Sequence, residues 1–270
     1  MVEIVEECLQ AYRAEVGEYA GQQQLQPAER MILARLAPLL QERPVLDLGV
    51  GAGRTTPHLR ALTQRYVGID ISPEMVASAR RSFPGVSFEV GDARALPFAD
   101  GSFDFVLFSF NGIDHADQAD RLRILAEIHR LLTPGGWFAF QTHNREVRWP
   151  GLRDRLRAVL PRLQQPRSWL RFPIAAVRAL GEHLRGHDVA EPSETFADHV
   201  MLRDSSRGYT VTYYAISLPA QLAQLQAAGF ESVQAFDLAG EPIGERGSQE
   251  WGITYLCQRS EGEIRGTTAR

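Results

Sequence analysis

Three glycines close behind a short apolar segment are the strongest chemical signal in the chain. Residues 45–53 read as a strand, VLDL, that runs into the turn GVGAG. Glycines in such a turn let the backbone approach a ligand closely, and the helix that follows offers free N–H groups. We therefore expect Gly49, Gly51 and Gly53 to bind a ligand.

The residues around this turn separate the known kinds of nucleotide site. A dinucleotide fingerprint requires a third glycine where Arg54 stands. A P-loop requires a lysine, and the sequence contains none, which also excludes a lysine Schiff base. Asp47, inside the strand, would repel a pyrophosphate and suits a ligand that carries an ammonium group. An NAD-dependent oxidoreductase is thus only a distant alternative.

Strands and helices that alternate along the chain must position these residues. Apolar segments at 45–48, 66–70, 86–90, 103–110 and 137–142 read as strands, and segments with helical periodicity separate most of them. Two last strands are expected at 230–238 and 251–258. This alternation predicts an α/β protein with a Rossmann-like, doubly wound, mainly parallel seven-stranded sheet.

The rest of the chain is arranged around one domain that we place at residues 1–260. Residues 1–41 are predicted to form an N-terminal helical cap. Residues 145–207, rich in proline, break the rhythm and predict a helical lid inserted between strands five and six. The polar tail 261–270 is expected to be disordered.

Five motifs in the order of the chain resemble the class I S-adenosylmethionine-dependent methyltransferase family. The family's pattern [VIL]-L-D-x-G-x-G-x-G is matched completely at 45–53, and D-I-S-P-E-M-V at 70–76 resembles its usual sequel. Gly91-Asp92-Ala93, Leu96-Pro97-Phe98 and L-L-T-P-G-G at 131–136 follow in the family's positions. The resemblance is strong over residues 40–142 and topological over 209–258.

This resemblance implies S-adenosylmethionine as the cofactor and assigns residues to it. Asp70 matches the acid that bonds both ribose hydroxyls, and Asp92 matches the residue that contacts the adenine amino group. Tyr12 and Tyr19 are expected to close over the cofactor, as N-terminal aromatic residues often do in such enzymes, and packing of these tyrosines between helices is the alternative. The full predicted cofactor set is Asp47, Gly49, Gly51, Gly53, Asp70, Ile71, Met75, Asp92, Ala93, Ser109 and Tyr19.

Residues past the fourth and fifth strands are the candidates for contact with the methyl acceptor. A histidine has an ordinary pKa near neutrality, so His115 and His143 are the candidate general bases. Asp114 could orient His115, although adjacent side chains seldom pair in this way. The predicted acceptor contacts are Asn111, Asn144 and Tyr214. No metal site is predicted.

The predicted insertion is strongly basic, whereas the whole chain has a net charge of −4. Residues 145–186 hold ten arginines and three acidic residues, with apolar residues between them at helical spacing. Such a lid could recognise an anionic or amphipathic acceptor, and replacing Arg153 and Arg157 by glutamate should then raise the acceptor KM. A solvated arginine face is the simpler alternative.

These observations predict an enzyme that transfers a methyl group from S-adenosylmethionine to an oxygen or nitrogen of a small molecule by in-line displacement. One alternative is a methyltransferase whose protein or lipid acceptor docks on the basic insertion. Another is a non-catalytic regulator that binds S-adenosylmethionine. We expect a cytoplasmic protein with no transmembrane segment, because the two cysteines are far apart and no apolar run is long enough to span a bilayer. The net charge of −4 predicts no nucleic-acid partner. The sequence leaves the oligomeric state open.

Overall fold

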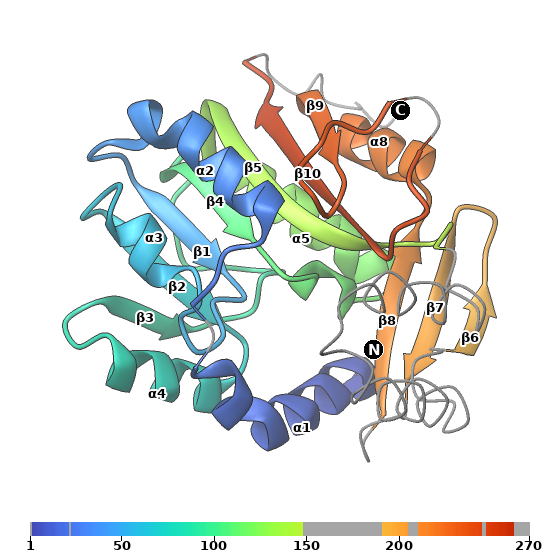
Figure 1. Ribbon diagram of the computed structural model, residues 1–270, viewed down its shortest axis with the longest axis horizontal. Helices are drawn as coiled ribbons and strands as arrows, with labels where there is room; N and C mark the ends of the chain where they lie inside the picture. The colour runs from blue at the N-terminus through green and yellow to red at the C-terminus, as the bar shows by residue number, and fades with distance from the viewer. Residues whose placement is uncertain (1, 22, 148–190, 205–209, 245–246, 262–270) are drawn as a thin grey trace, which may run out of the picture.

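The computed structural model describes residues 2–21, 23–147, 191–204, 210–244 and 247–261 (Figure 1). The described helices are α1 (Val2–Tyr19), α2 (Pro27–Leu40), α3 (Thr56–Arg60), α4 (Pro73–Ser82), the 3₁₀ turn η1 (Gly112–Asp114), α5 (Gln118–Leu131) and α8 (Leu218–Ala227). The described strands are β1 (Val45–Leu48), β2 (Tyr66–Asp70), β3 (Ser87–Val90), β4 (Phe103–Phe108), β5 (Leu132–Asn144), β6 (Glu191–Thr195), β7 (His199–Asp204), β8 (Val211–Ile216), β9 (Phe230–Phe236) and β10 (Gly252–Arg259).

The strands form one twisted sheet whose main part has the order β3-β2-β1-β4-β5-β10-β9. The first five of these strands are parallel, and β10 runs antiparallel to both of its neighbours. This confirms the predicted Rossmann-like α/β fold. The sheet has ten described strands instead of seven, because β8, β7 and β6 extend it from the end of β5.

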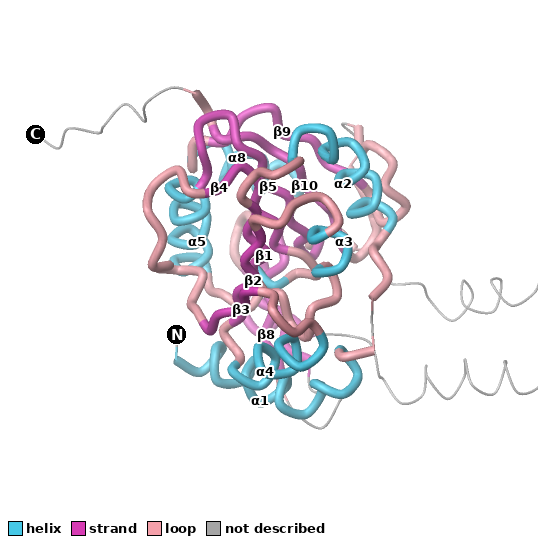
Figure 2. Tube along the Cα trace, turned by 90° about the vertical axis from the view of Figure 1, so that its left-hand side faces the viewer, coloured by secondary structure: helices cyan, strands magenta, loops and turns pink. Residues whose placement is uncertain are grey.

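Helices cover both faces of the sheet, as Figure 2 shows with α5 on one side and α2 and α3 on the other. Alternate residues of a strand face opposite sides, so Leu46 packs with α5 and α8 while Val45 packs with α2, α3 and α4. Local sequence fixes where these helices begin. Ser72 accepts a hydrogen bond from the backbone of Met75 at the start of α4, and Asp117 caps α5 in the same way.

Helix α1 lies across the carboxyl ends of the strands and contacts α4 at one end and β8 at the other (Figure 1). An ion pair of 2.9 Å joins Arg13 of α1 to Glu74 of α4. Near β8, Glu7 accepts a hydrogen bond of 2.8 Å from Thr212. The helix is therefore held on both sides of the crevice that it crosses.

The predicted insertion differs from expectation where the structure describes it. Residues 191–204 form the antiparallel strands β6 and β7 instead of helices. Pairing of β7 with β8 along its whole length outweighs the helical interpretation, and Pro192 is tolerated because β6 is the edge strand. Residues 148–190, with most of the arginines, and the predicted disordered tail beyond 261 lie outside the described residues. Within the described residues, no helix is both long and apolar enough to cross a bilayer.

Candidate active site

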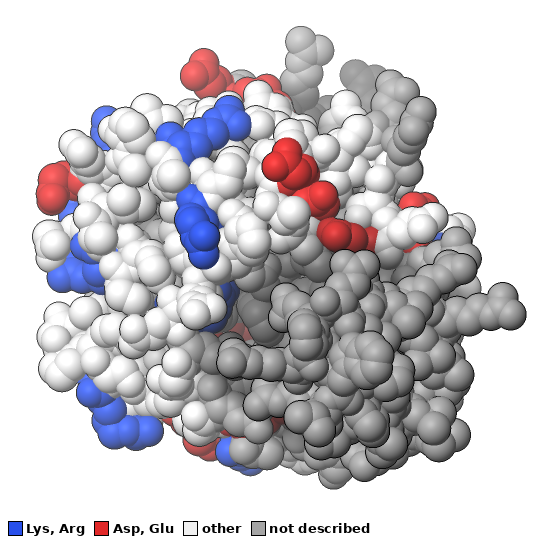
Figure 3. Space-filling model, viewed as in Figure 1, with Lys and Arg blue, Asp and Glu red and all other residues white. Residues whose placement is uncertain are grey.

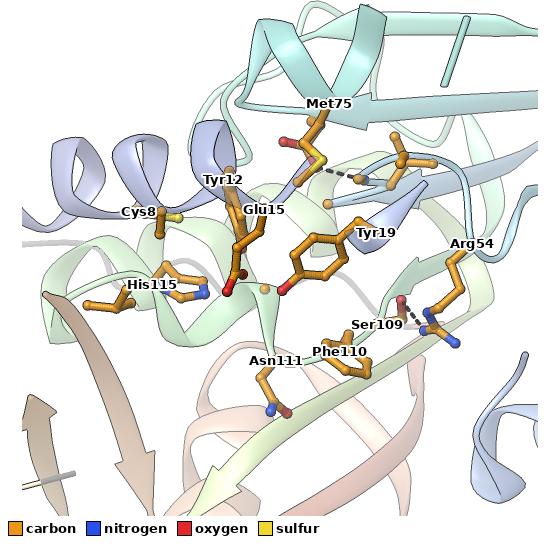
Figure 4. Close-up of a pocket in the computed structure, with 18 of the residues that line it drawn as sticks. Cys8, Tyr12, Glu15, Tyr19, Arg54, Met75, Ser109, Phe110, Asn111 and His115 are labelled. Carbon is orange, nitrogen blue, oxygen red and sulfur yellow. Dashed lines mark hydrogen bonds between the residues drawn. The ribbon is translucent and has the colours of Figure 1, made fainter. Parts of the chain in front are cut away.

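A cavity of about 540 Å³ lies beyond the carboxyl ends of β1, β2, β4 and β5. Parallel α/β sheets place their ligand crevice at this edge. Figure 4 shows Tyr12, Glu15 and Tyr19 reaching into it from α1, with Phe110 and Asn111 on the opposite wall. A smaller cavity of about 80 Å³ shares several wall residues with it, Asp70 and His115 among them. The two cavities thus form neighbouring parts of one site.

The glycine-rich turn forms part of this wall, with each glycine at a positive φ. A side chain at Gly49 would come within 2.8 Å of Phe108, and one at Gly53 within 2.5 Å of Phe83. A side chain at Gly51 would meet no atom of the described residues within 4 Å. Gly49 and Gly51 line the larger cavity, whereas Gly53 serves the packing of the turn.

Asp70 ends β2 and faces both cavities. Its two carboxylate oxygens accept backbone hydrogen bonds from Gly51 and Ser72, each at 2.8 Å. Burial raises the pKa of Asp70, and these backbone donors act against that rise. The acid is therefore fixed beside the glycine turn, at the position where the sequence predicts ribose binding.

Asp47 does not line the site, although the sequence predicts that it contacts the ligand directly. It is fully buried beneath the glycine turn and lines neither cavity. One of its oxygens accepts hydrogen bonds from Thr55 (2.6 Å) and Tyr66 (2.9 Å), and the other has no partner among the described residues. Burial raises the pKa of Asp47 to about 7. Leu46 and Leu48 face the α5 side of the sheet, and Asp47 between them on the strand faces the opposite side. Its side chain therefore supports the glycine turn from below.

The other predicted cofactor residues surround the two cavities. Tyr19, Met75 and Ser109 line the larger one, and Ile71, Asp92 and Ala93 line the smaller one. The side chain of Asp92 is paired with Arg94, which also contacts Asp120 at 2.6 Å. Although partial burial acts to raise it, the pKa of Asp92 is held below its usual value by Arg94.

His143, which lines the larger cavity, pairs with Asp114. Its Nδ1 lies 2.7 Å from Oδ2 of Asp114, and its backbone N–H donates to the same oxygen at 2.6 Å. Its Nε2 lies 3.3 Å from the amide nitrogen of Asn111. Asn111 and the preceding Phe110 both have positive φ values (60° and 53°), and strain of this kind gathers at functional sites.

His115 lies between the rings of Tyr12 and Tyr213, at centroid distances of 5.7 and 5.8 Å. Burial lowers the pKa of His115 to about 4, so its imidazole is neutral at pH 7. Its Nδ1 has no hydrogen-bond partner among the described residues. His115 lines the site but is too weak a base to take a proton readily near neutral pH.

Two predicted acceptor contacts lie elsewhere. Asn144 is buried and donates to the carbonyl oxygens of Ser248 (2.7 Å) and Glu250 (3.0 Å), so it closes a loop. Tyr214 is fully buried with its ring stacked on His199, and Tyr213 lines the cavity in its place. Successive residues of a strand face opposite sides, so an error of one position moves the side chain from the cavity to the core.

Several wall residues were not predicted from the sequence. Cys8, Ala11 and Glu15 face the cavity from α1 beside the predicted Tyr12, and their spacing of three and four residues is the signal that could have identified this helix face. Arg54 also lines the cavity, where it pairs with Glu29 at 2.6 Å and lies over the ring of Phe110. Trp251 comes from the loop before β10, which no local motif marks.

Comparison with known proteins identifies the family. A family profile described as "Methyltransferase domain" matches residues 45–136, from β1 into β5. The chain is 31% identical over 208 residues to a ubiquinone/menaquinone biosynthesis C-methyltransferase of Rubrivivax gelatinosus, and the match covers 76% of this chain and 69% of that protein. The chain belongs to the class I S-adenosylmethionine-dependent methyltransferase family.

Other similarities of this methyltransferase are more partial. It is 36% identical over 97 residues to a demethylmenaquinone methyltransferase of Chlorobaculum parvum, and the match covers 36% of this chain and 39% of that relative's length, which is less than two thirds. Its fold resembles that of Burkholderia thailandensis 1,6-didemethyltoxoflavin-N1-methyltransferase with a TM-score of 0.57 and 17% identity, covering 96% of this chain and 89% of the other. At that identity the similarity shows the fold alone.

Proposed function

We propose that this protein transfers a methyl group from S-adenosylmethionine to an oxygen or nitrogen of a small-molecule acceptor. The observation that carries the proposal is one cavity lined by two kinds of residues. Gly51 and Asp70 line it, and so does His143, which is paired with the buried Asp114. The site thus has room for a cofactor beside a group that can accept a proton.

The described residues fit this cofactor at two points. The open space above Gly51 admits a ligand close to the backbone, and the carboxylate of Asp70 can accept hydrogen bonds from two hydroxyl groups. Bound S-adenosylmethionine would supply a methyl group already activated by its sulfonium. Tyr19 and Met75 would hold the adenosyl part, while Asp92 and Ala93 would border its base.

The chain's own residues would then orient and desolvate the acceptor, which is most of what an in-line displacement requires. His143 is the candidate general base, because it lines the cavity and has a buried carboxylate behind it. His115 would stay neutral and contribute a ring to the wall. Two of the relatives named above are a demethylmenaquinone methyltransferase and a ubiquinone/menaquinone biosynthesis C-methyltransferase, and these names support a small-molecule acceptor.

The charge around the cavity favours a neutral acceptor over the anionic one that the basic insertion suggests. Among the described residues, the charged residues of the wall are the acids Glu15, Asp70 and Asp204 and the base Arg54, which is paired with Glu29. On the face shown in Figure 3, the described arginines are spread apart instead of forming a continuous basic surface. The arginines of 148–190 lie outside this comparison.

Calorimetric titration tests the proposal directly. The purified chain should bind S-adenosylmethionine and S-adenosylhomocysteine but not NAD, and Asp70→Ala should abolish that binding. Absence of binding by the unaltered chain would refute the proposed cofactor site. Acceptor-dependent formation of S-adenosylhomocysteine then separates an enzyme from a regulator that only binds the cofactor.

A further inference from the structure

The pair formed by His143 and Asp114 is built into the interior of the protein, although one of its members faces the cavity. The Asp114 side chain is fully buried, whereas the His143 side chain is 22% exposed. The two residues come from η1 and from the end of β5, which are brought together by the pairing of β4 with β5. The open side of His143 is therefore the side toward the site.

Each carboxylate oxygen of Asp114 has two hydrogen-bond partners. Oδ2 accepts the backbone N–H of His143 and faces Nδ1 of its ring, at 2.6 and 2.7 Å. Oδ1 accepts from Arg121 (2.7 Å) and from the hydroxyl of Thr142 (2.5 Å). Although burial acts to raise it, the pKa of Asp114 is lowered by His143 and by the charge of Arg121. Asp114 is thus an ionised carboxylate.

An ionised carboxylate can only accept hydrogen bonds, so Nδ1 of His143 must carry the proton. In a neutral imidazole this leaves a lone pair on Nε2. Asn111 supports the same assignment, because its amide nitrogen, a donor, lies 3.3 Å from Nε2. Both Asn111 and His143 line the cavity, so the basic nitrogen is at its wall.

Arg121 holds the carboxylate from behind. It is fully buried and donates to Gln221 (2.6 Å) and Thr142 (3.1 Å) as well as to Asp114, while its guanidinium lies 4.7 Å from the ring centre of Tyr214. A buried ion pair adds little or nothing to stability compared with well-packed apolar residues. The free-energy cost of burying the charges of Arg121 and Asp114 is explained if this ion pair positions a reactive group, His143.

We propose that Asp114, anchored by Arg121, positions His143 as the base that removes a proton from a hydroxyl group of the acceptor; this rests on the proposed function of the site. The acceptor O–H bond breaks and its proton passes to Nε2 of His143. The acceptor oxygen forms a bond to the methyl carbon, whose bond to sulfur breaks with the electron pair going to sulfur. A neutral amine needs no such base before transfer, so a base here favours an acceptor group whose proton must leave, and a hydroxyl is the group we propose.

The variant Asp114→Asn tests this positioning role in the full chain. Nitrogen-15 NMR of labelled histidine, with the His143 signal assigned from His143→Gln, should show the Nδ1–H form in the unaltered protein and a changed tautomer ratio in Asp114→Asn. Asp100→Asn is the matched control, because its side chain is 79% exposed and lines neither cavity. An unchanged His143 tautomer in Asp114→Asn would overturn the proposal.

Activity gives the second readout, with substituted phenols and the matching anilines as probes. Phenols should be methylated in preference to anilines, and Asp114→Asn should lower the phenol rate by roughly 10²- to 10⁴-fold and move the acidic limb of the pH–rate profile. Methylation of anilines alone would overturn the hydroxyl assignment. Binding of S-adenosylhomocysteine should stay intact in Asp114→Asn. If the unaltered chain fails to bind it, the proposed function itself is refuted, independently of the NMR result.

Discussion

The backbone N–H of Gly51 donates to Oδ2 of Asp70 at 2.8 Å, and this bond ties the turn after β1 to the end of β2. β1 and β2 are paired in parallel, so their carboxyl ends lie side by side. The same carboxylate accepts the backbone N–H of Ser72 with its other oxygen. One buried acid therefore shapes both turns that border the site before any ligand arrives.

This relationship predicts that Asp70 stabilises the protein without ligand. Asp70→Asn places an amide N–H₂ where one backbone N–H must donate, so one buried donor is left unsatisfied. We expect the free energy of unfolding in urea to fall by about 1–3 kcal/mol. Asp100→Asn, an exposed change of the same chemistry that removes only a surface ion pair with Arg130, should lower it by less than about 1 kcal/mol. Equal stability of both variants would show that the Gly51 bond contributes nothing to the free protein.

The open space at Gly51 separates its role from that of an ordinary turn glycine. Gly51 and Gly85 both have positive φ, and a side chain at either would meet no described atom within 4 Å. Alanine at each position should therefore cost a similar 1–2 kcal/mol of stability. Only Gly51→Ala should also weaken S-adenosylhomocysteine binding, by about tenfold or more, 1.4 kcal/mol. Equal binding by both variants in calorimetry would place the ligand elsewhere.

The parts of the fold that could be predicted are those fixed by short stretches of sequence. Apolar runs ending in Gly49 or Asp70 mark strands and their turns within a few residues, and the cap at Ser72 marks the start of α4. The order of these motifs along the chain then places Asp70 and Asp92 at one edge of the sheet. The positions of Asp70 and the glycine turn at the site follow from this local information.

Other features depend on contacts between distant segments. Asp114 pairs with His143, 29 positions away, instead of with the adjacent His115, because the register of β4 and β5 brings them together. Tyr213, not Tyr214, faces the cavity. Only the pairing of β8 with its neighbours decides which of these two side chains points toward the cavity and which toward the core. Asp47 lies under the turn, although its motif alone suits a ligand contact equally well. The positions of these three residues can be known only from the tertiary structure.

The ion pair between Arg54 and Glu29 predicts a non-additive effect on stability. Both side chains are largely buried, at 11% and 5% exposure, and Arg54 joins the glycine turn to α2. Arg54→Met leaves the carboxylate of Glu29 buried without its partner, so we expect a loss of about 3–5 kcal/mol. The double variant Arg54→Met, Glu29→Met should be more stable than Arg54→Met alone. Additive losses in urea unfolding would contradict this coupling.

Asp47 predicts how stability depends on pH. Burial raises its pKa from 3.8 to about 7, while Thr55, Tyr66 and the charge of Arg54 act in the opposite direction and Glu29 adds to the rise. Between those two pH values the folded protein holds a proton that the unfolded chain releases. The free energy of unfolding should therefore decrease as the pH rises from about 4 to about 7.

The variant Asp47→Asn isolates this contribution because it stays neutral and keeps an oxygen for Thr55 and Tyr66. Relative to the unaltered chain, its stability should improve progressively between about pH 4 and pH 7, by on the order of 1–4 kcal/mol in total. His115 works in the opposite sense, since its lowered pKa favours the folded state as the pH rises, but it is common to both proteins and cancels. Urea unfolding at a series of pH values measures the difference. Parallel curves for the two proteins would mean that Asp47 is ionised throughout and that its unpartnered oxygen is solvated.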